Sequence, residues 1–361
     1  MKTTGVHKAT KSYEAWLAGH TALVPEDVEL KHREMASAPF PFFRATFYRW
    51  AQIWPNTCAR LVDAPTVLAV GDLHIENFGT WRDAEGRLIW GINDFDEAVN
   101  LPYTVDLVRL ATSALLAINA SHLDITASAS AEAILAGYTN AMESGGTPFV
   151  LAERDPWLRD LATSKLRDPV AYWAKLDKLP VVQQGIPESA AVAIERLLPA
   201  QDLPYRIKHR IAGLGSLGRQ RYCAVADWRG GKLAREAKPL VPSAAVWAGE
   251  VQGVSDILYQ AIMDRSVRCA DPFVHLEGLW IVRRLAPDCS RIELADLPKQ
   301  KPETKLLNAM GAETANVHLG SPQAAKAICQ DLKKRPKGWL AEAAKAMEQA
   351  TLADHEDWKR G

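Results

Sequence analysis

Residues 66–97 read TVLAVGDLHIENFGTWRDAEGRLIWGINDFDE, and this stretch alternates short apolar runs with acidic loops. The first run, residues 66–70, is apolar and β-branched, which predicts a buried strand. Residues 78–81 and 88–92 flank the segment RDAEGR, a pattern typical of a hairpin. A loop that carries Asp72 and Asn77 therefore follows a strand, and Asp94 and Asp96 follow the hairpin.

Phosphoryl transfer needs this combination of side chains. A carboxylate orients and deprotonates the acceptor, and oxygen ligands hold magnesium on the nucleotide phosphates. We predict Asp72 as the base, Asn77 and Asp94 as magnesium ligands, and Asp96 as a further carboxylate at or behind the metal. The alternative is that these aspartates form turns and helix caps, the commoner role of a single Asp. His74 has no second His or Cys at ligand spacing, which favours a structural hydrogen bond over metal ligation.

Helical patterns surround this stretch. Residues 26–62 contain an aromatic block interrupted by Arg44, and residues 104–120 are apolar apart from Asp106 and Arg109, which predicts a central, buried helix. Further helices are expected in the segments 131–143, 169–178, 188–198, 243–263, 304–319 and 337–358.

A glycine motif, Gly213-x-Gly215-x-x-Gly218, lies between two extended patterns at 206–211 and 219–228. In a dinucleotide-binding domain this motif would follow an apolar strand and open a helix. Here basic residues alternate through the preceding strand, which favours an antiparallel pair. Strand, glycine loop and strand is the arrangement of kinases, in which the loop backbone, here including Ser216, covers the phosphates.

The strand at 232–238 would then supply a cation for the phosphates, either Lys238 or Arg235, and a following helix would supply Glu250 to hold it. A solvated edge strand with surface charges is the alternative. An apolar strand at 279–285 would place Ile281 and Val282 near the adenine edge.

The motifs VGDLHIEN (70–77), INDFDEA (92–98) and VDLVRL (105–110) resemble the aminoglycoside and choline phosphotransferase branch of protein-kinase-like enzymes. With PFPFFR (39–44) and GLGSLGRQRY (213–222), the chain resembles more closely a bacterial family, domain of unknown function 2252, over roughly residues 30–320. The resemblance implies a kinase-like fold without an established substrate. It also implies that Asp106 opens a buried helix and braces the catalytic loop.

The motif order differs from that of ordinary kinases, because the catalytic and metal loops precede the glycine loop. This order is expected of a circular permutation, and the helix at 304–319 would be the one that normally precedes the catalytic loop. The alternative is a glycine loop in an unrelated second domain. Metallophosphoesterases also use a Gly-Asp loop, but the further Gly-Asp-x-x-Asp and Gly-Asn-His loops of those enzymes are missing from this sequence.

Composition limits the class of protein. The chain has 361 residues, 48% hydrophobic and 24% charged, which fits a globular protein of two domains or two lobes and excludes collagen-like, coiled-coil and disordered chains. Lys+Arg and Asp+Glu both total 43, so we expect no nucleic-acid partner. No run approaches the roughly 20 apolar residues of a membrane span. Five scattered cysteines fit neither a zinc site nor a disulfide framework. We expect a cytoplasmic location.

Together these patterns predict an α+β, bilobed, protein-kinase-like fold in a circularly permuted order. Residues 1–202 and 301–361 would form a helical lobe, and residues 203–300 a β-rich lobe. The predicted function is ATP- and Mg²⁺-dependent phosphoryl transfer to a hydroxyl or amino group of an unknown small-molecule or protein acceptor. A nucleotide-binding pseudokinase and an AMP-transferring protein are the alternatives.

Overall fold

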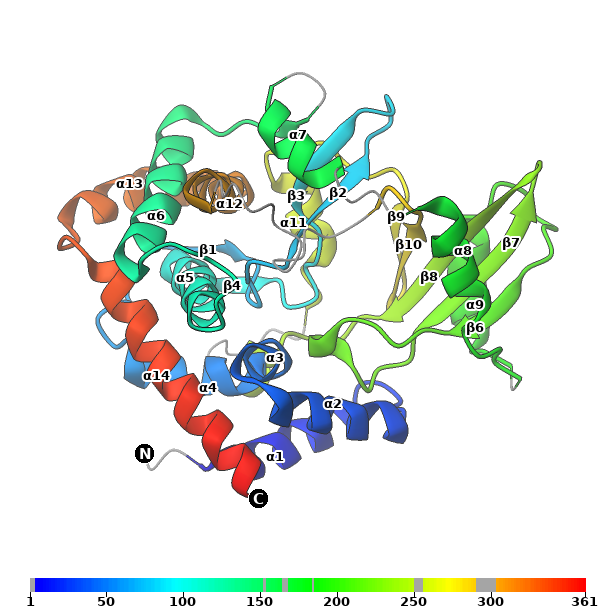
Figure 1. The fold of residues 1–361 in the computed structure, drawn as a ribbon, viewed down its shortest axis with the longest axis horizontal. Helices are drawn as coiled ribbons and strands as arrows, with labels where there is room; N and C mark the ends of the chain where they lie inside the picture. The colour runs from blue at the N-terminus through cyan, green and yellow to red at the C-terminus, as the bar shows by residue number, and fades with distance from the viewer. Residues whose placement is uncertain (1–3, 152–153, 164–167, 184, 250–255, 290–302) are drawn as a thin grey trace.

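The computed structural model describes residues 4–151, 154–163, 168–183, 185–249, 256–289 and 303–361, and the chain is a mixed α+β protein (Figure 1). The helices are α1 (Val6–Ala18), α2 (Pro25–Ser37), α3 (Pro39–Ala45), α4 (Phe47–Thr57), α5 (Tyr103–Asn119), α6 (Ala127–Ser144), α7 (Pro156–Thr163), α8 (Pro169–Asp177), α9 (Glu188–Arg196), α10 (Ala244–Trp247), α11 (Tyr259–Arg265), α12 (Glu303–His318), α13 (Pro322–Lys334) and α14 (Trp339–Arg360). The strands are β1 (Thr66–Ala69), β2 (Phe78–Arg82), β3 (Leu88–Ile92), β4 (Val99–Pro102), β5 (Phe149–Val150), β6 (Arg206–His209), β7 (Tyr222–Trp228), β8 (Gly231–Pro239), β9 (Val274–Glu277) and β10 (Trp280–Leu285).

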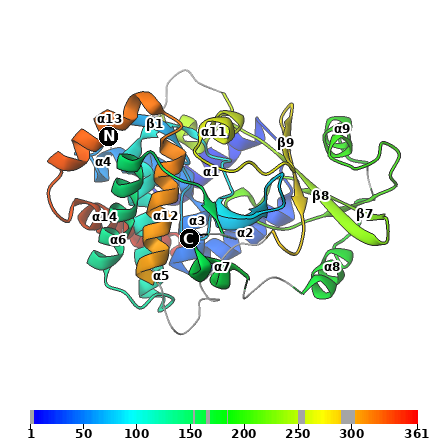
Figure 2. The same ribbon diagram turned by 90° about the horizontal axis from the view of Figure 1, so that it is seen from above.

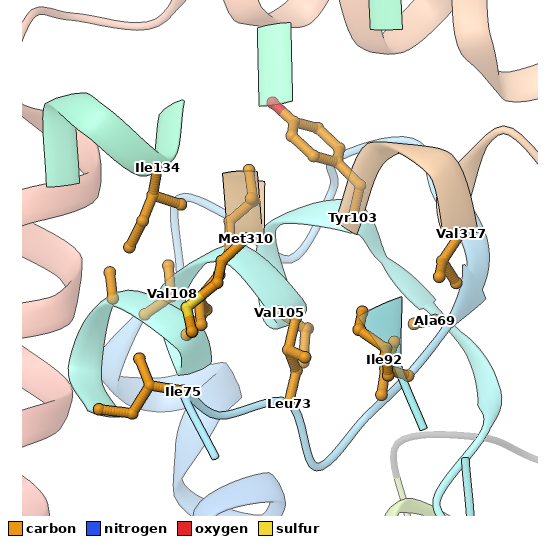
Figure 3. Close-up of a cluster of buried hydrophobic side chains, with 14 of the residues drawn as sticks. Ala69, Leu73, Ile75, Ile92, Tyr103, Val105, Val108, Ile134, Met310 and Val317 are labelled. Atoms are coloured by element: carbon orange, nitrogen blue, oxygen red, sulfur yellow. The ribbon is translucent and has the colours of Figure 1, made fainter. Parts of the chain in front are cut away.

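Helix α5 is the centre of the helical part. It is buried along nearly its whole length, as its apolar sequence predicts. Helix α14 packs along α5, and α6 packs against both α5 and α12. Figure 3 shows the cluster that results, in which Val105 and Val108 of α5 lie near Ile134 of α6 and Met310 of α12. Segments from both ends of the chain therefore share one core.

The acidic stretch runs along this core in two small antiparallel sheets. Strand β1 pairs with β4, and β2 pairs with β3, which also pairs with β5. Leu73 and Ile75, in the loop between β1 and β2, are buried against the α5 cluster (Figure 3). Because these two apolar side chains anchor the loop, the polar residues between and beside them are held in fixed positions.

A second layer is a five-stranded antiparallel sheet in the order β6-β7-β8-β10-β9 (Figure 1). Helix α9 packs on one face, where Ala224, Ala237 and Val282 are buried. Helix α8 packs on the other face, against Cys223 and Val225. In Figure 2 the two helices lie on opposite sides of the sheet. Both faces of the sheet can be buried in this way because neighbouring residues of a strand point to opposite faces.

Two sequence predictions differ from this arrangement. The expected boundary at residue 203 assigns α8 and α9 to the helical part, but both pack on the five-stranded sheet. The expected helix at 243–263 is in two pieces within the described residues, since α10 ends before Gly249 and α11 starts at Tyr259. Gly249 has a φ of +84°, a left-handed conformation that ends a helix.

Candidate active site

The loop after β1 depends on a close approach of two backbone segments. Gly71 has a φ of +82°, and a Cβ at this position would lie 2.5 Å from the carbonyl oxygen of Glu97. Only glycine fits this conformation and this contact. The tight turn brings Asp72 beside the segment that carries Asp94 and Asp96.

Asp106 holds this turn from beneath. It is fully buried, and its carboxylate accepts the backbone N–H groups of Val70 at 2.7 Å and Gly71 at 2.9 Å. Nε2 of His318, the last residue of α12, lies 2.9 Å from the same carboxylate. A residue more than 200 positions away in the chain thus supports the acidic loop. Ser321 adds to this junction, because its hydroxyl accepts the N–H of Leu68 at 2.9 Å.

Asp72 forms an ion pair with Arg109 of α5. Nε of Arg109 donates to Asp72 Oδ1 at 2.9 Å, and Nη2 donates to the same oxygen. The guanidinium lies 4.0 Å from the centre of the Phe43 ring and is fully buried. Burial raises the pKa of the Asp72 carboxyl group, and the lowering effect of Arg109 does not fully offset it. Asp72 is therefore a carboxylate whose proton affinity has been increased, a property required of a general base near neutral pH.

Asn77 and His74 brace each other within the loop. The N–H of His74 donates to Asn77 Oδ1 at 2.8 Å, and the N–H of Asn77 donates to the His74 carbonyl at 2.9 Å. Nδ1 of His74 accepts the N–H of Glu76 at 3.2 Å. The hairpin is tied to this loop because the N–H of Asn93 donates to the Asn77 carbonyl at 3.1 Å.

Lys238 joins the five-stranded sheet to the acidic segment. Its Nζ lies 3.6 Å from Asp94 Oδ1 and donates a hydrogen bond to Asp96 Oδ2. The side chain is buried on the central strand β8, so it is not the solvated edge residue of the alternative interpretation. Burial lowers the pKa of Lys238 although Asp94 and Asp96 raise it.

The glycine loop lies directly over Asp72. A Cβ at Gly215 would lie 3.3 Å from Asp72 Oδ2 and 3.1 Å from the Arg44 carbonyl, so a larger residue would press on both groups. Gly213 and Gly218 have φ values of +73° and +97°. The carbonyl of Gly218 accepts the N–H of Val24 at 2.8 Å, which fixes the loop to the N-terminal helices.

These contacts produce one small cavity, of about 40 Å³. The predicted residues that line it are Asp72, His74, Asn77, Asp94, Asp96, Gly213, Gly215 and Ser216. They come from two segments, residues 72–96 and 213–216, that are far apart in the sequence. Arg44, from the aromatic block, also lines the cavity. Tyr13, Glu97 and Arg219 line it too, and the sequence did not identify these three as site residues.

Other predicted residues lie elsewhere. Arg235 points to the α9 face of the sheet, where Nε donates to the Leu197 carbonyl at 2.9 Å. Val282 is buried on the same face, and Ile281 belongs to the main core; neither lines the cavity. Alternation along β8 places Arg235 on the opposite face of the sheet from Lys238, because the two residues are an odd number of positions apart. Val282 shares the face of Arg235 because it pairs with Ala237, whereas Ile281 pairs with Lys238. Glu250 lies outside the described residues.

The oxygen atoms of the cavity fit a magnesium ion. Asp96 Oδ1 is buried without a hydrogen-bond partner among the described residues, and the carboxylates of Asp72 and Asp94 share its cavity. Within the described part of the chain, no group of three or more His, Cys, Asp or Glu residues could hold a metal by itself. Magnesium is usually bound by one or two carboxylates together with substrate phosphates.

Residues 23–163 match the family model "Uncharacterized protein conserved in bacteria" (DUF2252). This is the bacterial family of unknown function that the motifs resemble, and the match includes the Asp72 loop, the hairpin and the Asp106 helix. It does not extend to the glycine loop. No curated protein and no solved structure matches the chain. None of the described helices is long and apolar enough to cross a membrane.

Proposed function

We propose that the protein is an ATP- and Mg²⁺-dependent phosphotransferase. The observation that carries the proposal is the position of Lys238, which approaches Asp94 and Asp96 from the five-stranded sheet. Phosphoryl transfer requires a cation for the phosphates, carboxylates for the metal and a base beside a phosphate-binding loop. Lys238, the pair Asp94 and Asp96, and Asp72 under the glycine loop would supply these groups.

Each group has a distinct role in this proposal. Asp72 receives the proton of the acceptor, and Arg109 orients its carboxylate. Lys238 and the backbone of the glycine loop, residues 213–218, bind the phosphates. Asn77, Asp94 and Asp96 would hold magnesium, which neutralises the negative charge of the phosphates when it is bound.

A kinase-like fold in a permuted order is part of the proposal. The glycine loop joins the first two strands of the five-stranded sheet, and the next strand carries Lys238. The end of α12 contacts the acidic loop through His318 and Ser321. These contacts support the interpretation of α12 as the helix that precedes the catalytic loop in the usual order. Helices α1 and α14 also touch, since His7 stacks on Trp358 with 4.7 Å between the ring centres.

The test is the Asp72→Asn variant. We expect it to bind ATP–Mg²⁺ as the wild type does and to lose turnover by a factor on the order of 10²–10⁴, because the base is removed and the phosphate contacts are kept. Turnover is measured as transfer of label from ATP to water or to the protein. Asp83→Asn is a matched control, since Asp83 is also a loop aspartate paired with an arginine, Arg87, and lies outside the cavity.

The position of the label decides the reaction. Transfer from γ-labelled ATP supports the proposal, and transfer from α-labelled ATP instead identifies AMP transfer. Binding without either transfer identifies a pseudokinase. Wild-type turnover in Asp72→Asn would contradict the role of Asp72 as base.

A further inference from the structure

A second cavity, of about 250 Å³, lies on the other side of the glycine loop. Gly213 lines both cavities. Asn93 and Phe95, the neighbours of Asp94, form part of its wall. One water molecule needs only about 10–15 Å³ on the same measure, so the cavity has room for many. It is therefore large enough for a ligand of several heavy atoms next to the candidate active site.

The charge of this cavity differs from that of the first. Five arginines line it: Arg210, Arg221, Arg268, Arg283 and Arg284. Asp271 is the one carboxylate among the described lining residues. Walls in which one sign of charge predominates focus the electrostatic field and attract ligands of the opposite sign.

One buried carboxylate, Glu236, accounts for the positions of three of these arginines. Its Oε1 lies 2.9 Å from Arg221 Nη1 and 3.1 Å from Arg283 Nη2, and its Oε2 accepts from Arg210. Burial would raise the pKa of Glu236, but the three arginines outweigh it and hold the pKa well below the usual range. One negative charge is thus shared by three positive ones, which leaves an excess of cationic charge.

Several guanidinium nitrogens in this wall have no partner among the described residues. Nε and Nη1 of Arg268 are buried without a hydrogen bond, and so is Nε of Arg221, a side chain only 3% exposed. Arg268 lies against aromatic rings, 4.7 Å from the centre of Trp81 and 4.9 Å from that of Phe95. Glu313, the carboxylate that raises the pKa of Arg268 most against the lowering effect of burial, already accepts hydrogen bonds from Ile92 and Asn316. Buried donors without acceptors are rare in folded proteins, so they point to a missing ligand.

We propose that this arginine cavity binds the phosphates of a phosphorylated ligand. Guanidinium groups match phosphate oxygens with paired N–H donors, and the five arginines outnumber the two carboxylates, Glu236 and Asp271, described among them. The proposal goes beyond the proposed function, because it requires neither magnesium nor group transfer. The phosphates belong either to the nucleotide or to a second, phosphorylated ligand.

The test measures binding of tripolyphosphate to the full chain by calorimetry, in buffer without magnesium or other phosphate. We expect the wild type to bind, and Arg268→Gln and Arg283→Gln to bind at least tenfold more weakly. Arg196→Gln is the control, because Arg196 is an exposed arginine on α9 that pairs with Glu277, away from the cavity. Its affinity for tripolyphosphate should equal that of the wild type.

A thermal melt separates binding from a structural role. Without phosphate, Arg268→Gln should melt at the wild-type temperature or above, because the remaining arginines repel one another less. Tripolyphosphate should raise the melting temperature of the wild type more than that of the variant. A lower melting temperature with unchanged affinity, or no binding by the wild type, would overturn the proposal.

Competition identifies the source of the phosphates. If ATP–Mg²⁺ displaces tripolyphosphate, the cavity holds the nucleotide's own phosphates; if both bind together, it holds a second ligand. The same titration with Asp72→Asn tests phosphate binding in the arginine cavity independently of phosphoryl transfer. Binding to that variant supports the arginine cavity even where phosphoryl transfer is absent.

Discussion

Arg109 is a full positive charge in the middle of a buried helix, and Asp72 is the carboxylate that compensates it. Burying either charge alone costs several kcal/mol, and together they form a pair with additional contacts to Phe43. We predict that Arg109→Met lowers the free energy of unfolding by roughly 3 kcal/mol at pH 8, because Asp72 is left without its cation.

The pH dependence of this loss has a definite sign. The folded-state pKa of Asp72 is already raised by burial, and removal of Arg109 raises it further. Folded Arg109→Met then holds more protons than the unfolded chain above pH ~3.9, so its stability falls as the pH rises. Urea unfolding at pH 5 and pH 8 should show the smaller deficit at pH 5. When Arg109→Met is combined with Asp72→Asn, the loss of unfolding free energy should not change with pH. A pH-independent loss in the single variant Arg109→Met would contradict the pairing of Arg109 with Asp72.

The sequence alone could predict Asp72, Asn77 and Asp94 as a set, because their spacing follows one strand and one hairpin. It could not predict which arginines face them. Arg109 was visible as one of two charges in an otherwise apolar helix, a signal that a partner must exist. Arg268 and Arg283 gave no local signal, since their cavity is assembled from segments that meet only in the folded chain.

At the scale of elements, α6 and α12 cross with almost no space between their backbones. A Cβ at Gly137 would lie 1.9 Å from the Asn308 carbonyl oxygen, and one at Gly311 would lie 2.0 Å from that of Ile134. The two helices approach closely because both contact points are glycines. This packing supports His318, at the end of α12, in its contact with Asp106.

We predict that Gly137→Ala lowers the free energy of unfolding by about 1–3 kcal/mol, since the backbones of α6 and α12 must separate to admit the methyl group. Thermal and urea unfolding measure the change. Helix propensity by itself favours alanine over glycine by about 1 kcal/mol. The Ala136→Gly variant changes the same two residue types at the exposed neighbouring position of α6. It therefore measures the contribution of helix propensity alone. Equal or greater stability of Gly137→Ala would show that the helices are not in contact at this point.

Periodicity predicted most elements near this crossing, including α5, α12 and the β2–β3 hairpin, because each pattern is local. The assignment of α8 and α9 was wrong for a physical reason. An amphipathic helix reveals that one face is buried, but its sequence does not identify the surface that covers that face.

At the scale of the whole molecule, the apolar residues divide into separate clusters. The main cluster combines α5, α6, α12 and α14 with the acidic stretch. A smaller one joins α9 to the five-stranded sheet through Val282 and its neighbours. Between these parts, Lys238 pairs with Asp94 and Asp96, and Ile281 of β10 belongs to the main cluster. The candidate active site therefore lies where the two parts meet.

Separate clusters predict separate opening reactions, which hydrogen exchange can measure. Val282 is fully buried between α9 and the sheet, and Leu307 is almost fully buried in the main cluster. Val282→Ala should lower the opening free energy of the sheet by about 2 kcal/mol and speed amide exchange in β7, β8 and α9 by tenfold or more. Exchange in α5, α6 and α12 should keep its wild-type rate. Leu307→Ala is the matched variant, and it should speed exchange in those three helices. If both variants speed exchange equally throughout the described chain, the protein opens as one cooperative unit, and the active-site groups cannot separate without global unfolding.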